Sequence, residues 1–383
     1  MELKAQFNEF LAAIRPTEKQ KEDWRTGAVT LRSRLASDPE LGSLVVATFL
    51  QGSIRRATAV RPSGDRRPDA DVVVVTKLDH TRTTPQKALD KFVPFLDRHY
   101  PGKWRPQGRS FGIELSYVDL DLVVTALPPD DAGSDFMARL YRSEAVSTPL
   151  TLEEAEDWRL NEKWHPARLG VLANSLGEFE LADEPPQKWQ PHPLLLPDRD
   201  VNMWGRTHPI AQIRWTAAKN RRCNGHYVNL VRAVKWWRHN CKDRLPKYPK
   251  GYPLEHMVGT ILPDGASSVA HGFVQVMEGI RDTWAGHAQL RIVPTLPDHG
   301  VPEHDVLKRL DVEHFVAFHG AVSEAASAAR KALENEDAQE SAELWRGLLG
   351  SRFPLPGPQG GDRPRSGFTP PIKPAAPAVG RFA

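Results

Sequence analysis

Apolar residues recur along the first 130 positions in two rhythms, one helical and one extended. A helix is predicted over residues 17–37, because large apolar side chains return every three or four positions and Thr17 with Gln20 matches a capping box. Short, β-branched apolar runs predict buried strands. They cover residues 44–50, 71–76 and 114–124. Strands mixed with helices indicate an α/β or α+β first half.

The pattern becomes mostly helical after about residue 207. The predicted helices of this part cover residues 226–240, 254–261, 267–280 and 304–349, and one earlier helix is predicted over residues 84–100. We therefore expect an α+β chain with a sheet domain over residues 1–205, which includes the N-terminal helix, and a helical domain over residues 206–349. The proline-rich stretch 177–201 between the two parts predicts no regular element.

Residues 350–383 form a segment of a different composition. They hold eight of the 33 prolines, six glycines and a net charge of +4. Such a segment buries too little apolar surface to offset its ordering entropy, so a disordered tail is predicted.

Charge and composition exclude several classes of protein. The chain has 51 basic and 48 acidic side chains, and without the +4 of the tail its net charge of +3 becomes −1. A body without a basic footprint does not require nucleic acid as a partner. No apolar run approaches the roughly 18 residues of a membrane span, and the first residues lack the apolar core of a signal peptide. Two cysteines form no disulfide framework, which fits a reducing cytoplasm.

Carboxylates at the start of the second predicted strand are the first candidate for chemistry. Asp69 and Asp71 are two positions apart, so on a strand they share one face. Two such carboxylates can bind a pair of divalent ions, and a third acid on a neighbouring strand would complete the site. Asp121 and Asp119 both qualify for that place. An isolated Asp-x-Asp pair is more often simply hydrated, so the other motifs decide the interpretation.

The order of these motifs resembles the polymerase-β-type nucleotidyltransferase superfamily. In that superfamily an apolar strand leads into Gly-Ser, Asp-x-Asp opens a second strand, and a third aspartate lies on a later strand. Here Gly52-Ser53, Asp69-Ala70-Asp71 and Leu120-Asp121-Leu122 match, with a spacer of fifteen residues that is slightly longer than usual. The resemblance favours Asp121 over Asp119. It implies that Asp69, Asp71 and Asp121 hold two Mg²⁺ ions, or Mn²⁺, and that Gln51, Gly52 and Ser53 bind the nucleotide.

A second cluster narrows the family. Lys235 lies on the predicted amphipathic helix over residues 226–240, and Tyr252 follows 17 positions later at the start of the next helix. This layout resembles oligoadenylate synthases, cyclic GMP–AMP synthase and their bacterial relatives, the cGAS/DncV-like nucleotidyltransferases of antiphage defence. The resemblance implies that Lys235 contacts the donor triphosphate and that Tyr252 borders the donor base. A serine or glutamine often precedes this tyrosine in the family, but Gly251 stands here and cannot make that contact.

The resemblance implies a bilobed bacterial enzyme with its active site in the cleft between a polymerase-β-like sheet domain and an oligoadenylate-synthase-like helical domain. Such an enzyme joins nucleoside triphosphates, ATP among them, into a cyclic di- or trinucleotide and releases pyrophosphate in the cytoplasm. A downstream effector then binds the product. Two alternatives stay open: a nucleotidyltransferase with a linear product, which would use the same site, and a catalytically idle RNA-binding or scaffold protein.

The C-terminal residue is a further candidate by resemblance. Some bacterial members of the family have a flexible C-terminus that ends in a small residue, to which an E1/E2-like conjugating enzyme attaches a target. This chain ends in Ala383, where glycine is more usual. Ala383 is therefore a predicted conjugation terminus.

Overall fold

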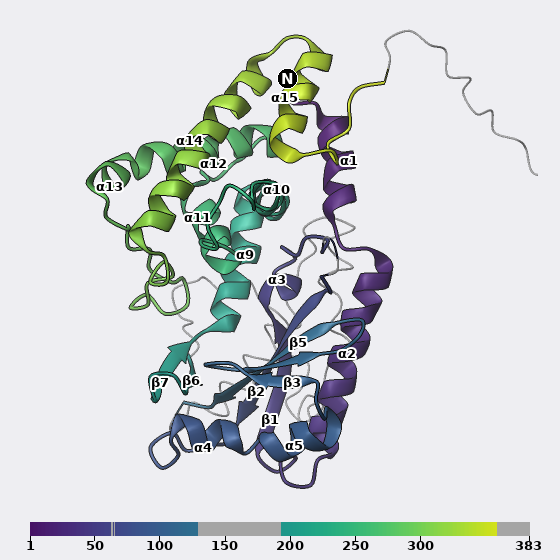
Figure 1. The fold of residues 1–383 in the computed structure, drawn as a ribbon, viewed down its shortest axis with the longest axis vertical. Helices are drawn as coiled ribbons and strands as arrows, with labels where there is room; N and C mark the ends of the chain where they lie inside the picture. The colour runs from purple at the N-terminus through teal and green to yellow at the C-terminus, as the bar shows by residue number, and fades with distance from the viewer. Residues whose placement is uncertain (63, 65, 129–192, 358–383) are drawn as a thin grey trace, which may run out of the picture.

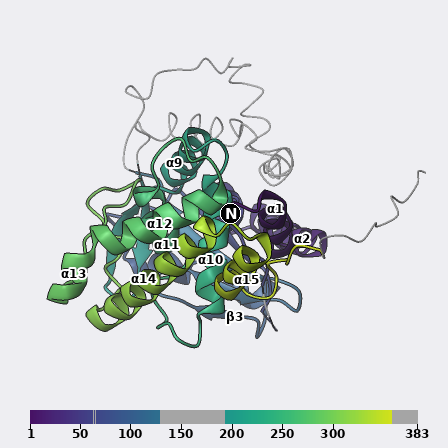
Figure 2. The same ribbon diagram turned by 90° about the horizontal axis from the view of Figure 1, so that it is seen from above.

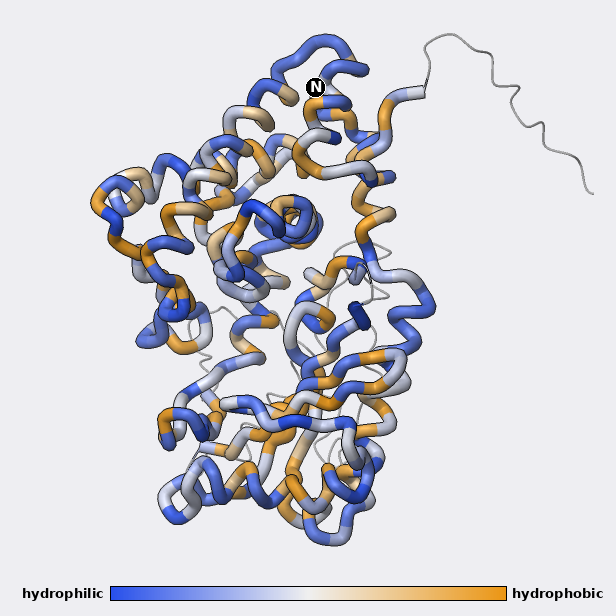
Figure 3. The backbone as a smooth tube through the Cα atoms, in the orientation of Figure 1, coloured by the Kyte–Doolittle hydropathy of each residue, from blue (hydrophilic) through white to orange (hydrophobic). Residues whose placement is uncertain are grey.

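A computed structural model describes residues 1–62, 64, 66–128 and 193–357 of the chain. These residues form two lobes, a β-sheet lobe and a helical lobe, which lie one above the other in Figure 1. The predicted α+β class is confirmed. Apolar backbone segments concentrate in the strands of the sheet and in the centre of the helical lobe, as the hydropathy colours of Figure 3 show.

A mixed sheet forms the core of the first lobe. Its strand order is β1-β2-β5-β4-β3, and β2 and β5 run parallel while the other neighbours are antiparallel. The strands are β1 (Val45–Gln51), β2 (Asp69–Thr76), β3 (Trp104–Pro106), β4 (Phe111–Glu114) and β5 (Asp119–Ala126). β2 is almost entirely buried after its first residues, which explains its unbroken valine run.

Two predicted elements of this lobe are divided in the structure. The strand predicted over residues 114–124 begins only at Asp119 as β5, because the chain turns after β4, which ends at Glu114. The helix predicted over residues 84–100 is a pair, α4 (Pro85–Asp90) and α5 (Val93–His99). Two strands that the sequence did not predict, β6 (Leu194–Asp198) and β7 (Met203–Thr207), pair with each other, and β6 also pairs with β5.

Helix α2 (Glu18–Ser37) covers one face of the sheet and begins at the predicted capping box of Thr17 and Gln20. Its contact with the sheet requires Gly27, because a Cβ atom there would lie 2.7 Å from Cγ1 of Val118. The apolar side of α2 is buried against the sheet, as its periodicity predicts, through Trp24, Ala28, Leu31 and Leu35.

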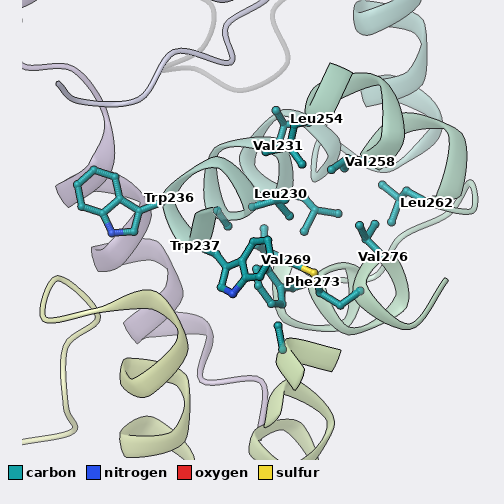
Figure 4. Close-up of a cluster of buried hydrophobic side chains, with 14 of the residues drawn as sticks. Leu230, Val231, Trp236, Trp237, Leu254, Val258, Leu262, Val269, Phe273 and Val276 are labelled. Atoms are coloured by element: carbon teal, nitrogen blue, oxygen red, sulfur yellow. The ribbon is translucent and has the colours of Figure 1, made fainter. Parts of the chain in front are cut away.

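The second lobe consists of helices around one apolar core. They are α1 (Lys4–Ile14), α9 (Pro209–Arg222), α10 (Tyr227–Asn240), α11 (Tyr252–Ile261), α12 (Val269–Thr283), α13 (Ala285–Leu290), α14 (Val312–Glu334) and α15 (Ala338–Leu349). Figure 2 shows α10 among α12, α14 and α15. Trp237 points into the core while Trp236 lies on the side of α1 (Figure 4). The helix predicted over residues 304–349 begins only at Val312 and is broken between α14 and α15.

The predicted domain boundaries need correction at both ends of the chain. Helix α1, assigned to the sheet domain from the sequence, packs instead in the core of the helical lobe through Phe7 and Phe10. The predicted disordered tail is wrong at its beginning, because Phe353 is completely buried with its ring centroid 5.1 Å from that of Phe7. The rest of that tail, including Ala383, lies outside the described residues.

Among the described residues, no helix combines the length and the hydropathy that crossing a bilayer requires.

Candidate active site

Three neighbouring strands bring their polar residues into one row at the edge of the sheet. In the strand register, Gln51 of β1 lies opposite Asp71 of β2, and Asp71 lies beside Asp121 of β5. Asp69 is level with Asp119 in the same way. The structure therefore brings together the acids that the sequence singled out: Asp121 is the neighbour of Asp71, and Asp119 is the neighbour of Asp69.

The Gly-Ser turn follows directly at the end of β1. Gly52 opens the short helix α3 (Gly52–Arg55) with φ +74°, a left-handed conformation that favours glycine. A Cβ atom at this position would lie only 1.8 Å from Oδ2 of Asp71. Glycine is therefore required at position 52 both by the backbone conformation and by the Asp71 carboxylate.

Asp121 and Asp119 differ in their partners. Asp121 accepts a hydrogen bond from the amide of Gln107 (3.0 Å), and Ser110 donates in turn to the Gln107 oxygen (2.9 Å). Asp119 instead forms an ion pair with Arg67 (2.8 Å). Asp121 thus hydrogen-bonds to a neutral amide, and its negative charge can still attract a cation. The negative charge of Asp119 is instead offset by Arg67. Gln107 belongs to no sequence motif, so its contact with Asp121 could not be predicted from the sequence.

The electrostatics of the row are unfavourable without a bound cation. Burial raises the pKa values of Asp69, Asp71 and Asp121 above the usual range for aspartate, and repulsion from the neighbouring carboxylates adds to this for Asp69 and Asp71. Part of the Asp69 side chain is open to water, whereas Asp71 is half-buried. Within the described part of the chain, neither Asp69 nor Asp71 forms an ion pair with a basic side chain.

The donor set fits a divalent metal ion in an open site. Carboxylate oxygens are the ligands of Mg²⁺, which binds through one or two carboxylates plus water and phosphate oxygens. In the ranges that the structure describes, no group of three or more His, Cys, Asp or Glu side chains is arranged to hold a metal ion by itself. The carboxylates of Asp69, Asp71 and Asp121 have the chemistry of Mg²⁺ ligands, but their arrangement alone does not form a metal site.

The helical lobe contributes a buried ion cluster to the same region. Glu255 of α11 accepts from Nε of Arg56 (3.0 Å), directly after α3, and pairs with Nζ of Lys235 on α10 (2.6 Å). Lys235 also donates to the backbone oxygen of Thr58 (3.1 Å). Sequence reasoning singled out Lys235 but missed Glu255 and Arg56. Burial lowers the pKa of Lys235, while the two cations lower the pKa of Glu255 to about 2.

Tyr252 lies beside this cluster at the first turn of α11. The guanidinium carbon of Arg56 is 4.9 Å from the centre of the Tyr252 ring. The ring of His256, one turn later, lies edge-on to Tyr252 with centroids 5.6 Å apart. The structure thus places Tyr252 next to Arg56, whose segment leaves the Gly-Ser turn.

Comparison with known proteins supplies the context of this site. Residues 1–133 match a family model described as the Second Messenger Oligonucleotide or Dinucleotide Synthetase domain. The whole chain is 59% identical to the whole of a cyclic AMP-AMP-GMP synthase from Enterobacter hormaechei subsp. hoffmannii (strain UCI 50). It is also 29% identical to a cyclic AMP-AMP-AMP synthase from Acinetobacter sp. (strain ATCC 27244 / 9458), over 92% of this chain and 86% of that protein.

The fold is shared with solved structures at low sequence identity. A structure of E. coli MS115-1 CdnC with ATP superimposes on 92% of this chain and 100% of its own, with a TM-score of 0.60 and 16% identity. The predicted polymerase-β-like sheet domain with a helical second domain is confirmed as the fold.

Proposed function

Because the chain belongs to the cGAS/DncV-like nucleotidyltransferases, which join nucleoside triphosphates into cyclic oligonucleotide second messengers, we propose that it makes cyclic AMP-AMP-GMP from two ATP and one GTP. The observation that supports this product is the 59% identity to a cyclic AMP-AMP-GMP synthase over the full length of both chains. The linear-product alternative is not favoured, since the curated relatives are cyclic synthases. An idle scaffold would not need the aligned carboxylates.

In each transfer step, a ribose hydroxyl loses its proton to water and its oxygen forms a bond to the α-phosphorus of a triphosphate, while the bond between that phosphorus and the pyrophosphate oxygen breaks. Three such steps close the ring and release three pyrophosphates. Asp69, Asp71 and Asp121 would hold the divalent metal ions, Mg²⁺ or Mn²⁺, that activate the hydroxyl and stabilise the leaving charge. The residues of the chain position the reactants and exclude other geometries.

The remaining residues of the site have assigned roles in this proposal. Gln51 and Gly52 border the carboxylate row, and the amides and hydroxyl at Ser53 bind the triphosphate. Tyr252 borders the donor base. Lys235 provides positive charge near the triphosphate, through the ion cluster with Glu255.

The experiment that tests this function identifies the product. The purified protein is incubated with ATP, GTP, CTP and UTP and Mg²⁺, treated with phosphatase, and the product mass is measured. A phosphatase-resistant product with the mass of cyclic AMP-AMP-GMP is expected, and the variant carrying both Asp69→Asn and Asp71→Asn should form none. A product with a phosphatase-sensitive end, or a different base composition, would contradict the proposal.

The wider setting is also part of the proposal. The reaction would take place in the bacterial cytoplasm as antiphage signalling, with a separate effector that binds the product. An E1/E2-like enzyme would conjugate the chain through Ala383. Deletion of Phe382 and Ala383 should then abolish covalent adducts without changing the activity of the purified enzyme, and adducts that persist would exclude this role.

A further inference from the structure

The ion cluster of Arg56, Lys235 and Glu255 joins the two lobes beside the carboxylate row. All three side chains are almost completely buried, with exposures of 7%, 12% and 3% respectively. Glu255 is contacted from both sides, because Nε of Arg56 approaches one carboxylate oxygen (3.0 Å) and Nζ of Lys235 the other (2.6 Å). This carboxylate is one of the direct links between the Gly-Ser segment and helices α10 and α11.

The cluster has an excess of positive charge. Two cations share one carboxylate, and among the described residues no other acid forms an ion pair with Arg56 or Lys235. Asp71 is the nearby acid that acts on both cations through space. Because Asp71 is proposed above to bind the metal ions, the cluster keeps positive charge for a polyanion.

The cluster is also connected to the turn that is proposed to hold the triphosphate. Lys235 donates to the backbone oxygen of Thr58 (3.1 Å), and the Thr58 amide donates to the backbone oxygen of Ser53 (2.8 Å). The amide of Arg56 donates to the oxygen of Gly52 (3.1 Å). Lys235 and Arg56 are thus each tied to the Gly-Ser turn by the backbone of the same short segment.

We infer that Glu255 is a positioning residue that neutralises Arg56 and Lys235 while no nucleotide is bound, and that the triphosphate shares these two cations when it binds. The inference rests on the proposed function, since it takes a nucleoside triphosphate as the ligand. In the free protein the negative charge of Glu255 offsets the repulsion between the two buried cations. In the complex its negative charge opposes the triphosphate, so Glu255 stabilises the free protein more than the complex.

The test removes the charge of Glu255 and measures ligand affinity separately from turnover. The probe is α,β-methylene-ATP with Mg²⁺, which the transfer reaction cannot cleave, and its Kd is measured by calorimetry for wild type and Glu255→Gln. The variant should unfold at a lower temperature without ligand but bind the probe more tightly, on the order of tenfold, because one unit of repulsion is removed. Its unfolding temperature should therefore rise more with saturating probe than that of the wild type.

A control variant changes an ion pair that shares no residue with the Arg56–Lys235–Glu255 cluster. Glu278 of α12 pairs with Arg330 (2.8 Å), and Glu278→Gln should lower the unfolding temperature without changing the Kd of the probe. If Glu255 has only a structural role, Glu255→Gln will behave like this control, and the inference fails.

A second comparison, made in protein that already carries Lys235→Met, tests the inference if the single variant Glu255→Gln does not fold. The double variant Lys235→Met, Glu255→Gln removes one charge of each sign and leaves Arg56 in place. It should bind the probe more tightly than Lys235→Met alone. Equal or weaker binding in this pair would overturn the inference, whereas the identity of the product in wild type is scored independently.

Discussion

Asp121 lies beside Asp71 and Asp119 beside Asp69 on parallel strands, so the side-chain partners of the two candidate acids, and not the strand register, distinguish them. Asp119 is two residues earlier on the same face, but Arg67 already neutralises it (2.8 Å). Both acids follow equally from the alternation of the strand, so the sequence alone could separate them only through family resemblance. The partner Arg67 comes from the Pro/Gly-rich loop, whose conformation no periodicity predicts.

Substitution of these two acids should have unequal effects. Asp121→Asn is expected to reduce kcat/KM at least about a hundredfold, about 2.7 kcal/mol of transition-state stabilisation, because a charge of the row is lost. Asp119→Asn should cost much less. Steady-state rates of pyrophosphate release from both purified variants provide the measurement, and the reverse ranking would show that Asp119 is the functional acid.

Gly52 allows a prediction with a closely matched control. Gly52→Ala is strained by φ +74° and also pushes a methyl group against the Asp71 carboxylate. It should lose at least about tenfold in kcat, or about 1.4 kcal/mol, and about 1–2 kcal/mol of stability. Gly265 has φ +79° with no atom within 4 Å of its added Cβ. Gly265→Ala should therefore lose similar stability and keep wild-type activity, as measured by urea unfolding and product formation. Equal activity of the two variants would refute the contact with Asp71.

At the scale of elements, helix α11 is held by a stack of three aromatic rings. His299, from the loop before α14, lies between Trp215 of α9 and His256 of α11, with centroids 3.5 and 3.6 Å away and nearly parallel rings. Gly259 makes this possible, since a Cβ atom there would lie 2.4 Å from the Trp215 ring. The stack fixes the first turns of α11, where Tyr252 and Glu255 lie.

This stack should make stability depend on pH. Burial lowers the pKa of His256 to about 4 and that of His299 to about 3, with Asp298 opposing the shift of His256 and Lys219 adding to that of His299. In the unfolded chain both imidazoles take up a proton as the pH falls below about 6.5, whereas in the folded chain they stay neutral. The stabilisation is therefore fully present above that pH, and the free energy of unfolding falls as the pH drops toward 4.

His299→Phe keeps an aromatic ring and removes one titrating group. Between pH 7 and pH 5 the wild type should lose at least about 1 kcal/mol of unfolding free energy through these rings, and His299→Phe should lose less. Urea unfolding at the two pH values measures this, and His287→Gln on α13, which removes a histidine outside the stack, is the control. An unchanged pH slope in His299→Phe would show that the ring is not protonated on unfolding in this range.

The elements themselves were predictable where one periodicity dominated. Helix α2 was predicted with its cap and its buried face, and α10 and β2 were predicted because their apolar positions match one secondary-structure period throughout. The hairpin of β4 and β5 was missed, since alternating residues continue through the turn between them. Strands β6 and β7 were missed because their proline-rich surroundings carry the signal of a loop.

At the scale of the whole molecule, sequence-distant segments complete both lobes. Helix α1 begins the chain but packs with α10 and α12, and Lys235 and Glu255 bring α10 and α11 to the Gly-Ser segment of the sheet lobe. Local patterns carry no information about which core an amphipathic helix joins. This is why residues 1–14 were assigned to the wrong lobe and why Glu255, in an apolar helix, was not recognised as a partner of Lys235.

The C-terminal end shows the same effect and leads to a whole-molecule prediction. Composition marks residues 350–383 as a tail, yet Phe353 is fully buried against Phe7 and Phe10, with ring centroids 5.1 and 5.7 Å away. Phe353→Ala should therefore lower the unfolding free energy by about 3–5 kcal/mol, because it leaves a cavity where helix α1 meets the segment that follows α15. Deletion of residues 361–383 should change neither the melting temperature nor basal synthesis appreciably. Calorimetry on both variants measures this contrast, and a larger loss from the deletion than from Phe353→Ala would show that the stabilising contacts lie beyond residue 360.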